Sequence, residues 1–577
     1  MNAKESAPVE GETRSEFLEL AGTRPDVLIV GGGINGLSVM RDLALQGVTV
    51  VLIDRGDVMS GASAASSHMI HGGIRYLENG EFRLVRESVQ ERNDLLVTAP
   101  HVVKPLKTIV PMFSLFSGIL HAPLRMLVHR QGKHRERGAF LIAVGLTIYE
   151  SFSRGSASMP RFRFRARRES LADLPSLNPR VKYSATYFDA SVHEPERLAL
   201  DVLADAVATG NARVVTYAEA VGAADGAVLI RDALSRDVIH LAADVVVNAS
   251  GPFTDLTNSA LGKATTFMGG TKGSHIVVDH PQLFAELDGR ELFFENSDGR
   301  IVLIYPVKGR VLIGTTDIFV DAAGPVVCTH EEVTYFFELV KHILPGITLQ
   351  ESHIVFRYSG IRPLPRHEEA QPGFVSRDYR IVNGILPSSS GVPLLSIVGG
   401  KWTTFRALGE QVCNDILTIM GKERRVSTHG LAIGGGRDYP SRPSERDEWL
   451  GKRAGLLTRE RLETLLERYG TRADDVIEAT LREGDKPLRS ISTYSSAEVR
   501  YLVREENVVR LDDFFLRRTS LAFAGGITTE LVEEIADMVG EALTWSPQRR
   551  SAEIDRVWQI LRDYHGVDLP VSVQDRF

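Results

Sequence analysis

The stretch VLIVGGGINGLSV at residues 27–39 decides the fold of this chain. Its glycines Gly31, Gly33 and Gly36 have the spacing G-x-G-x-x-G and stand directly between a predicted strand and a predicted helix. In such a turn the first glycine makes the tight bend, the second lets the backbone approach a pyrophosphate, and the third lets helix and strand pack closely. The helix N-terminus then offers free N–H groups and the positive end of its dipole to that pyrophosphate.

A second strand and an acidic residue complete a βαβ unit. The helix is expected from Asn35 to about Gln46, and the strand VTVVLID follows at 48–54. Asp54 ends this strand 21 residues after Gly33, where a carboxylate can accept hydrogen bonds from ribose hydroxyls. Asp54 argues against NADP, whose 2′-phosphate prefers a nearby arginine. On these residues alone, NAD and FAD are both candidates.

Two further stretches favour FAD, the longer dinucleotide. The serine-rich run SGASAASSHMIHGG at 60–73 offers small residues along which an extended cofactor can lie. Far along the chain, SIVGGKWTTFRALGE at 396–410 is expected to form a strand and then a helix whose positive end faces a flavin. A cofactor that touches both stretches must be long. The expected cofactor contacts from these segments and from the strand DVVVNASG are Gly31, Gly33, Asn35, Gly36, Asp54, Ser66, Ser67, Gly251, Gly400, Lys401, Thr403 and Thr404.

Composition sets the broad class of the protein. The 577 residues are enough for two to four cores at roughly 100–200 residues per domain. The 43% hydrophobic and 24% charged shares are ordinary for a soluble globular protein. A net charge of −7 argues against nucleic acid as the main partner. Two cysteines, Cys328 and Cys413, cannot form a disulfide framework, and we expect no metal site.

The N-terminus and the apolar runs bear on localisation. Residues 1–24 are expected to be a flexible segment without a secretory signal. The apolar runs at 108–120 and 139–149 fall short of the ~20 residues that a spanning helix needs. We expect a cytoplasmic protein that associates at most with the face of a membrane. The cationic run 121–154 is typical of an interfacial segment, and RFRFRARR at 161–168 predicts a strand whose phenylalanines face a core.

The remaining segments predict the domain organisation. The all-apolar runs at 244–251 and 394–400 are typical of strands that are buried on both faces. β-rich segments lie between them, and the pattern becomes helical after about residue 430. The predicted class is α/β: a Rossmann-like cofactor domain, an inserted antiparallel-sheet substrate domain and a C-terminal helical domain. The oxidoreductase region is expected at 25–430, and a helical domain at 431–577, with a linker at 434–436. Within the first region, the cofactor-binding parts are expected at about 25–105, 200–265 and 355–425. The substrate-domain parts are expected at about 106–199 and 266–354.

A series of motifs, in this order, resembles the FAD-dependent glycerol-3-phosphate dehydrogenases, which have the D-amino-acid-oxidase type of fold. The resemblance covers about residues 25–430, and the stretch at 501–526 resembles the family's C-terminal helical domain. The motifs are DVLIVGGGINGL (26–37), SSHMIHGGIRYLENGEFRLV (66–85), NASGPF (248–253), KGSHIVV (272–278), IGTTD (313–317), YSGIRPL (358–364), SRDY (376–379) and GGKWTTFR (399–406).

The resemblance implies a reaction and a set of site residues. The reaction is oxidation of sn-glycerol 3-phosphate to dihydroxyacetone phosphate, with hydride transfer to FAD and electrons passed to a quinone. Guanidinium groups suit the phosphate because their donors match its oxygens. Gly72 and Gly73 are expected beside the flavin, and His275 is the first candidate for the base, with His71 as the second. The residues expected to bind or act on the substrate are Arg75, Tyr76, His275, Arg362, Arg377 and Lys401, with Arg362 also counted as catalytic.

Several alternatives stay open at this point. His68 stands where the family commonly has a lysine, and Arg362 could instead pin a loop through an ion pair. The chain could be an oxygen-consuming oxidase or a dehydrogenase for another polyol phosphate, such as erythritol phosphate. It could also be a non-catalytic flavin-binding scaffold. A homodimer and peripheral association with an anionic membrane are further hypotheses.

Overall fold

A six-stranded, mostly parallel sheet carries the glycine-rich turn in the computed structural model, which describes residues 14–114, 139–152, 159–296, 300–320, 326–366 and 378–568. The strand order is β18-β19-β11-β1-β2-β7. Every neighbouring pair is parallel except the edge pair β18–β19. The strands are β1 (Val27–Val30), β2 (Val50–Ile53), β7 (Ala212–Val215), β11 (Val245–Asn248), β18 (Arg380–Ile385) and β19 (Pro393–Val398).

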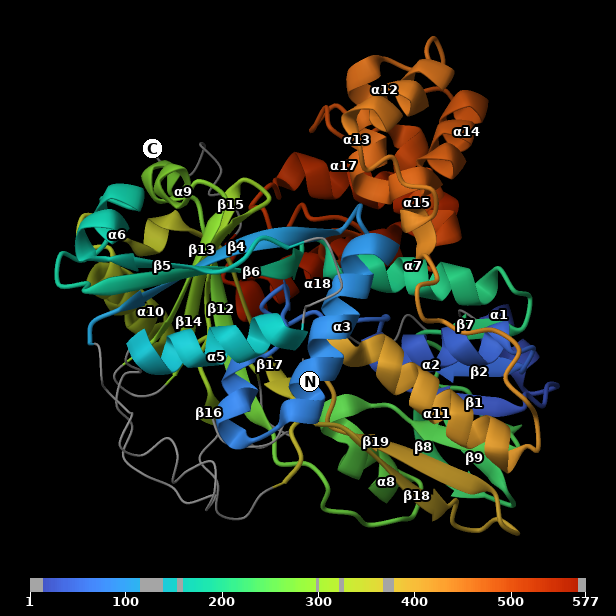
Figure 1. Cartoon of the computed structure of the whole chain (residues 1–577). Coiled ribbons are helices and arrows are strands. Elements are labelled where there is room, and N and C mark those ends of the chain that lie inside the picture. Colours follow the sequence, from blue (N-terminus) through green and yellow to red (C-terminus); the bar gives the residue numbers. More distant parts are fainter. Residues whose placement is uncertain are drawn as a thin grey trace.

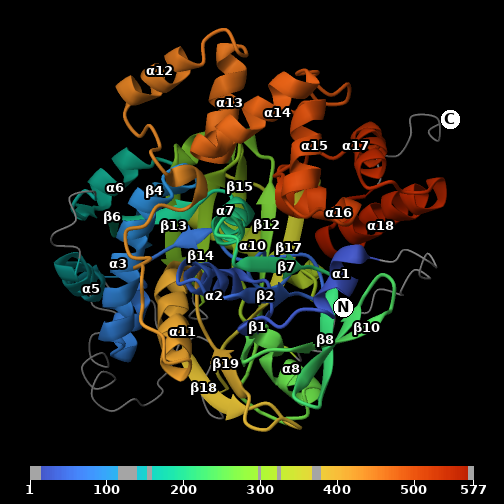
Figure 2. The same ribbon diagram turned by 90° about the vertical axis from the view of Figure 1, so that its right-hand side faces the viewer.

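Different elements cover the two faces of this sheet, with α2 and α11 on one side of β1 and β8 and β10 on the other (Figure 2). The helical layer is α2 (Ile34–Leu45), α7 (Pro195–Val207) and α11 (Phe405–Ile419). The opposite layer is α1 (Ser15–Leu20), α8 (Thr254–Ala260) and the strands β8 (Ala218–Ala224), β9 (Ala227–Asp232) and β10 (Val238–Ala242). Strands β1, β2 and β11 are buried throughout, which confirms the prediction from their unbroken apolar sequence.

A ten-strand mixed sheet forms the second layer of the molecule (Figure 1). All its pairs are antiparallel except β13–β4. The helices α9 (Pro281–Leu287) and α10 (His330–Ile343) cover one face. Its strands are β3 (Met69–Ile70), β4 (Val103–Met112), β5 (Arg163–Ala166), β6 (Tyr183–Val192), β12 (Thr271–Val278), β13 (Arg290–Glu295), β14 (Ile301–Val307), β15 (Arg310–Gly314), β16 (Ile318–Phe319) and β17 (Ile354–Arg362).

The two ends of the substrate-domain insertion differ from the division made on sequence. β3 pairs with β6, so residues 69–70 belong to the large sheet although they were assigned to the cofactor domain. β17 pairs with β12 along most of its length, so the return to the cofactor domain comes after residue 362 and not at 355. Hydrogen bonding to a distant strand decides both assignments, and neighbouring sequence does not encode it.

The C-terminal domain is helical, as predicted, and lies across the end of both sheets (Figures 1 and 2). The predicted linker at 434–436 is buried, and a Cβ on Gly435 would lie 1.9 Å from the Tyr469 carbonyl oxygen. The linker is therefore a close crossing of two chain segments. The helices are α12 (Pro443–Lys452), α13 (Arg459–Tyr469), α14 (Ala473–Glu483), α15 (Ser496–Glu505), α16 (Leu511–Asp513), the π-helical turn η8 (Phe514–Arg518), α17 (Thr529–Ala542) and α18 (Pro547–His565).

One local prediction is wrong and another holds only in part. Within the segment predicted to be flexible, α1 buries Phe17 and Leu20 completely, because their spacing of three places both on one helical face. In the Arg/Phe run, Phe162 packs against a core as predicted, but β5 is only four residues long and Phe164 stays 38% exposed. No helix in the described parts of the chain is long and apolar enough to cross a membrane, and most of the run 121–154 lies outside them.

Candidate active site

The glycine-rich turn brings backbone segments into direct contact. Gly31 has a φ of +116°, and a Cβ there would lie 2.6 Å from the Ala249 carbonyl oxygen. A Cβ on Gly36 would lie 2.0 Å from the Gly31 carbonyl oxygen. Only glycine fits either position. The turn therefore leaves the N-terminus of α2 facing the space between β1 and β11, as a dinucleotide requires.

Asp54 ties the turn to the end of β2. Its Oδ2 accepts a hydrogen bond from the Gly32 N–H at 2.7 Å, and its Oδ1 accepts one from the Gly56 N–H at 2.9 Å. Burial raises the pKa of Asp54 to about 6, even though these two N–H groups stabilise the ionised form. The carboxylate thus stands ready for further donors at the position where a ribose is expected.

A cavity of about 1280 Å³ opens beside this turn. It is larger than the roughly 300–1,000 Å³ of ordinary ligand pockets, and residues 60–65 of the serine-rich run line it. The Asn35 Oδ1 is buried with no hydrogen-bond partner among the described residues. An open acceptor, a glycine cradle and an acidic residue fit the pyrophosphate and ribose of FAD. Of the expected contacts, the cavity lining includes Gly31, Gly33, Asn35, Asp54 and Gly251.

The other expected cofactor residues lie outside that lining, and one of them, Ser67, contacts the candidate base. His275 on β12 is 2% exposed, and its Nε2 is 2.8 Å from the Ser67 Oγ. The imidazole stacks on Tyr358 of β17 with ring centroids 4.8 Å apart. The Tyr358 hydroxyl donates to the Ser66 carbonyl oxygen. The serine-rich run is therefore fixed to the substrate-domain sheet at Ser66 and Ser67.

The electrostatic surroundings of His275 keep it neutral. Burial and the nearby charge of Arg362 lower the pKa of His275 well below its usual value. Its Nδ1 is buried with no hydrogen-bond partner in the described part of the chain. If Nε2 donates to the Ser67 hydroxyl, the lone pair of the imidazole is on Nδ1, where it can accept a proton.

Arg362, at the end of β17, lies over β12 and holds the loop after β15. Its guanidinium donates to Asp317 Oδ1 at 2.9 Å, to Thr315 Oγ1 at 2.8 Å and to the Thr316 carbonyl oxygen at 2.9 Å. A Cβ on Gly273 would lie 2.2 Å from its Nη2, so glycine there makes room for it. Arg362 therefore does pin the loop after β15, as the alternative interpretation proposed. Asp317 and Gly273 contact this arginine, and the sequence alone did not single them out.

A separate group forms where the IHGG run meets the start of α11. The Lys401 Nζ lies 4.8 Å from the centre of the Tyr76 ring, a favourable cation–π arrangement. The His71 N–H donates to the Thr403 Oγ1, which donates to the His71 carbonyl oxygen. Gly400, with a φ of +105°, packs against the Asn35 amide. Thr404 is buried beside this group, while the side chain of Arg75 and all of Arg377 lie outside the described residues.

Neighbouring side chains leave no room for a Cβ at Gly72 or Gly73. A Cβ on Gly72 would lie 2.2 Å from the Tyr149 Oη, and one on Gly73 would lie 2.4 Å from the Tyr76 ring. The Gly72 N–H donates to the Tyr149 Oη at 2.9 Å and to Asp189 Oδ1 at 3.1 Å. Arg92 donates to both of these acceptors. This buried network from α3 (Phe82–Thr98), α5 (Ala139–Phe152) and β6 positions the run, and spacing in the sequence carried no signal for it.

Tyr149→Phe is expected to loosen the His71–Tyr76 run without unfolding the protein. The variant removes one acceptor from the Gly72 N–H and one from Arg92. Because one hydrogen bond contributes about 1 kcal/mol, amide exchange across residues 70–76 should become roughly fivefold faster. Hydrogen exchange read by mass spectrometry measures this. Tyr187→Phe is the matched control, since Tyr187 lies edge-on to Tyr149 in the same core; equal exchange in the two variants would contradict the prediction.

His68 stands where the family commonly has lysine, and it lines the cavity. Its ring stacks on Phe523 with centroids 5.1 Å apart. Burial lowers the pKa of His68 to about 3, so the side chain is neutral at physiological pH. The departure therefore replaces a flexible cation by an uncharged ring packed against the C-terminal domain.

Comparison with known proteins agrees with this geometry. Residues 26–406 match the family described as FAD dependent oxidoreductase, and residues 426–550 match the C-terminal domain of alpha-glycerophosphate oxidase. A glycerol-3-phosphate dehydrogenase of Synechocystis sp. is 32% identical over 533 residues, 88% of this chain and 90% of that protein. The chain belongs to the FAD-dependent glycerol-3-phosphate dehydrogenase family. It is an FAD-dependent oxidoreductase, and FAD is its cofactor.

Other members and a solved structure extend the comparison. D-erythritol 1-phosphate dehydrogenase of Brucella abortus is 30% identical over 502 residues, 86% of this chain and 94% of that protein. The structure of glycerol-3-phosphate dehydrogenase from Bacillus halodurans complexed with FAD aligns over 94% of this chain and 96% of its own, with a TM-score of 0.72 and 23% identity. This likeness confirms the D-amino-acid-oxidase type of fold. Membership of an enzyme family argues against the hypothesis that the chain is a non-catalytic flavin-binding scaffold.

FAD affinity is expected to depend on the ionisation of Asp54. Ribose hydroxyls donate to a carboxylate, so the apoprotein must lose the Asp54 proton before FAD binds well. With a pKa of about 6, the dissociation constant of FAD should rise as pH falls below 6, by up to tenfold per pH unit. Flavin fluorescence titrations from pH 5 to 8 measure this. Asp54→Asn should bind FAD more weakly at pH 7.5 and lose this pH dependence; an unchanged pH profile in Asp54→Asn would contradict the assignment.

Proposed function

We propose that the protein oxidises sn-glycerol 3-phosphate to dihydroxyacetone phosphate and passes the electrons through FAD to a quinone. The observation that carries this proposal is that His275 and Arg362 lie on the neighbouring strands β12 and β17, close enough for the charge of Arg362 to lower the pKa of His275. A neutral imidazole and a guanidinium supply a proton acceptor and an anion anchor within one site. Family membership supports the choice of a phosphorylated polyol.

The phosphate of the substrate is held by cations. Arg362 is held by Asp317 and the loop after β15, which sets the orientation of its guanidinium. Lys401 approaches from the start of α11, and Arg75 and Arg377 are proposed to complete the site. Tyr76 packs against Lys401 and lines the pocket. A phosphate monoester carries nearly two negative charges at neutral pH, which several cations can balance.

His275 removes the proton of the C2 hydroxyl. The chemistry that FAD would supply when bound at this site is acceptance of the hydride from C2. The hydrogen bond to Ser67 fixes the orientation of the imidazole, and Nδ1 takes the proton. Burial and Arg362 disfavour the protonated ring, so it returns quickly to the neutral form that the next turnover needs. His275 is 2% exposed, so water has little access to this step.

A second candidate substrate is erythritol phosphate, which the similarity to the Brucella abortus enzyme favours. The two substrates share a secondary alcohol and a phosphate, and differ by one CHOH unit. Anaerobic bleaching of the bound flavin by each compound separates them. The proposal expects faster bleaching by glycerol 3-phosphate, and the opposite order would replace it. Reoxidation by a quinone analogue without peroxide supports the acceptor, whereas stoichiometric peroxide in air would identify an oxidase.

A further inference from the structure

We propose that the C-terminal helical domain completes the FAD site, with Arg517 and Arg518 as positioning residues for the cofactor turn Asp54–Asp57. This inference uses FAD alone and does not depend on which polyol phosphate is oxidised. The domain otherwise has no assigned part in the chemistry. The argument starts from the carboxylate of Asp57, which stands three residues after the ribose-binding carboxylate of Asp54.

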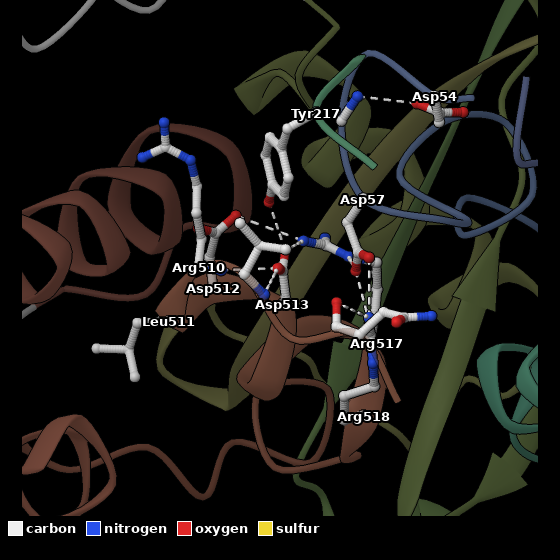
Figure 3. A network of polar contacts seen from close by, with 12 residues as sticks. Asp54, Asp57, Tyr217, Arg510, Leu511, Asp512, Asp513, Arg517 and Arg518 are labelled. Atoms are coloured by element: carbon white, nitrogen blue, oxygen red, sulfur yellow. Dashed lines mark hydrogen bonds and ion pairs between the residues drawn. The ribbon is translucent and has the colours of Figure 1, made fainter. Parts of the chain in front are cut away.

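Asp57 is held by two arginines from the other end of the chain (Figure 3). It is 1% exposed. Arg518 donates to it through both ends of its guanidinium, at 2.6 Å to Oδ2 and 2.9 Å to Oδ1. Arg517 donates from Nε to Oδ2 at 2.5 Å. Paired, charge-assisted hydrogen bonds of this kind are among the strongest and most directional that proteins form.

The opposite side of the same turn has a second link to the C-terminal domain. The Gly56 carbonyl oxygen accepts a hydrogen bond from the Tyr217 N–H at 3.0 Å. The Tyr217 hydroxyl donates to Asp513 Oδ1 at 2.5 Å, and Arg517 donates to the same oxygen at 2.8 Å. The turn is therefore connected through Asp54 to the glycine-rich loop and through Asp57 and Tyr217 to α16 and η8.

Charge strengthens this coupling. The negative charge of Asp57 adds to burial in raising the pKa of Asp54. Arg517 and Arg518 offset that charge, so docking of the C-terminal domain favours the ionised Asp54 that ribose hydroxyls need. Without them Asp57 would be a buried, unpaired carboxylate, which would have to take up a proton or move out of its buried position. Both arginines also line the cavity that holds the cofactor.

The decisive comparison is between two arginines that bridge the domains. Arg518→Ala removes the contact to the cofactor turn. Arg472→Ala is the matched control: Arg472 pairs with Asp201 of α7 at 3.1 Å and does not line the cavity. Titration of each apoprotein with FAD should show at least a tenfold higher dissociation constant for Arg518→Ala and less than a twofold change for Arg472→Ala. Equal weakening in the two variants overturns the proposal.

Two further readouts separate positioning from general stability. The pH midpoint of FAD binding should move upward in Arg518→Ala, because the charge of Asp57 is then less offset, and should stay in place in Arg472→Ala. Arg518→Lys, which keeps the charge but loses the paired donors, should recover part of the affinity. An unmoved midpoint in Arg518→Ala, or no recovery in Arg518→Lys, counts against the proposal.

The wild-type protein provides a test that needs no variant, in case Arg518→Ala fails to fold. Coupling is reciprocal, so FAD must stabilise the docked C-terminal domain as much as that domain stabilises bound FAD. Amide exchange across residues 511–519 should slow when FAD is added, together with exchange across 31–57. Slowing confined to the first domain would overturn the inference. Neither measurement involves substrate turnover, so their failure is distinct from failure of the proposed reaction.

Discussion

Arg362→Ala is expected to lower kcat/KM for glycerol 3-phosphate by roughly a hundredfold or more, mainly through KM. The proposed role of Arg362 is to donate to the phosphate from a position that Asp317 and Thr315 fix. Losing one partner of a buried charged hydrogen bond costs about 2–5 kcal/mol, which corresponds to this range. Steady-state kinetics with FAD-saturated enzyme measures the effect.

A companion variant distinguishes substrate binding from loop pinning. Asp317→Asn weakens the ion pair that holds the loop but leaves the guanidinium in the site. If Arg362 binds phosphate, Asp317→Asn should lose much less activity than Arg362→Ala, while both lose a similar amount of thermal stability. If the two variants lose activity equally, Arg362 acts by pinning the loop, and the anchor assignment is wrong.

His275→Asn is expected to lower kcat by roughly 10²–10⁴-fold, the usual contribution of a positioned general base. The side-chain amide is uncharged and cannot accept the hydroxyl proton. Binding should change little, so the loss should appear in kcat and not in KM. Rapid mixing under anaerobic conditions, which follows flavin bleaching, reports this step directly.

The pH profile of the wild-type enzyme gives an independent check on His275. Its pKa lies well below 6.5 because of burial and Arg362, so the neutral, active form stays populated as pH falls through 6.5. We therefore expect kcat to show no loss centred near 6.5. A loss centred there, or a larger defect in His71→Asn than in His275→Asn, would transfer the role of base to His71, whose backbone is bound to Thr403.

Much of the cofactor site could be predicted from local sequence. A close backbone approach, 2.6 Å at Gly31 and 2.0 Å at Gly36, excludes any side chain at these positions, and Gly31 also has a positive φ. The strands around them are unbroken apolar runs, which both faces of a buried sheet require. Asp54 follows at the end of the next strand. Each of these features depends on a few neighbouring residues, and for that reason a single sequence reveals them.

The contacts that explain other site residues became visible only in the folded structure. Gly72 is fitted to Tyr149, which comes from α5. Arg362 was predicted as an anchor, but its partner Asp317 depends on the loop after β15 packing against β17. The low pKa of His275 follows from its burial and from the charge of Arg362, which is distant in sequence.

By itself the sequence determined that this chain builds a glycine-rich dinucleotide turn on a parallel sheet, because backbone conformation and apolar period are set within a few residues. The tertiary structure alone decided that Arg517 and Arg518 would meet Asp57. Such a contact joins residues about 460 positions apart, so it exists only after two sheets and a helical domain have packed. Long-range contacts depend on how whole helices and strands pack, and the spacing of residues in the sequence does not predict them.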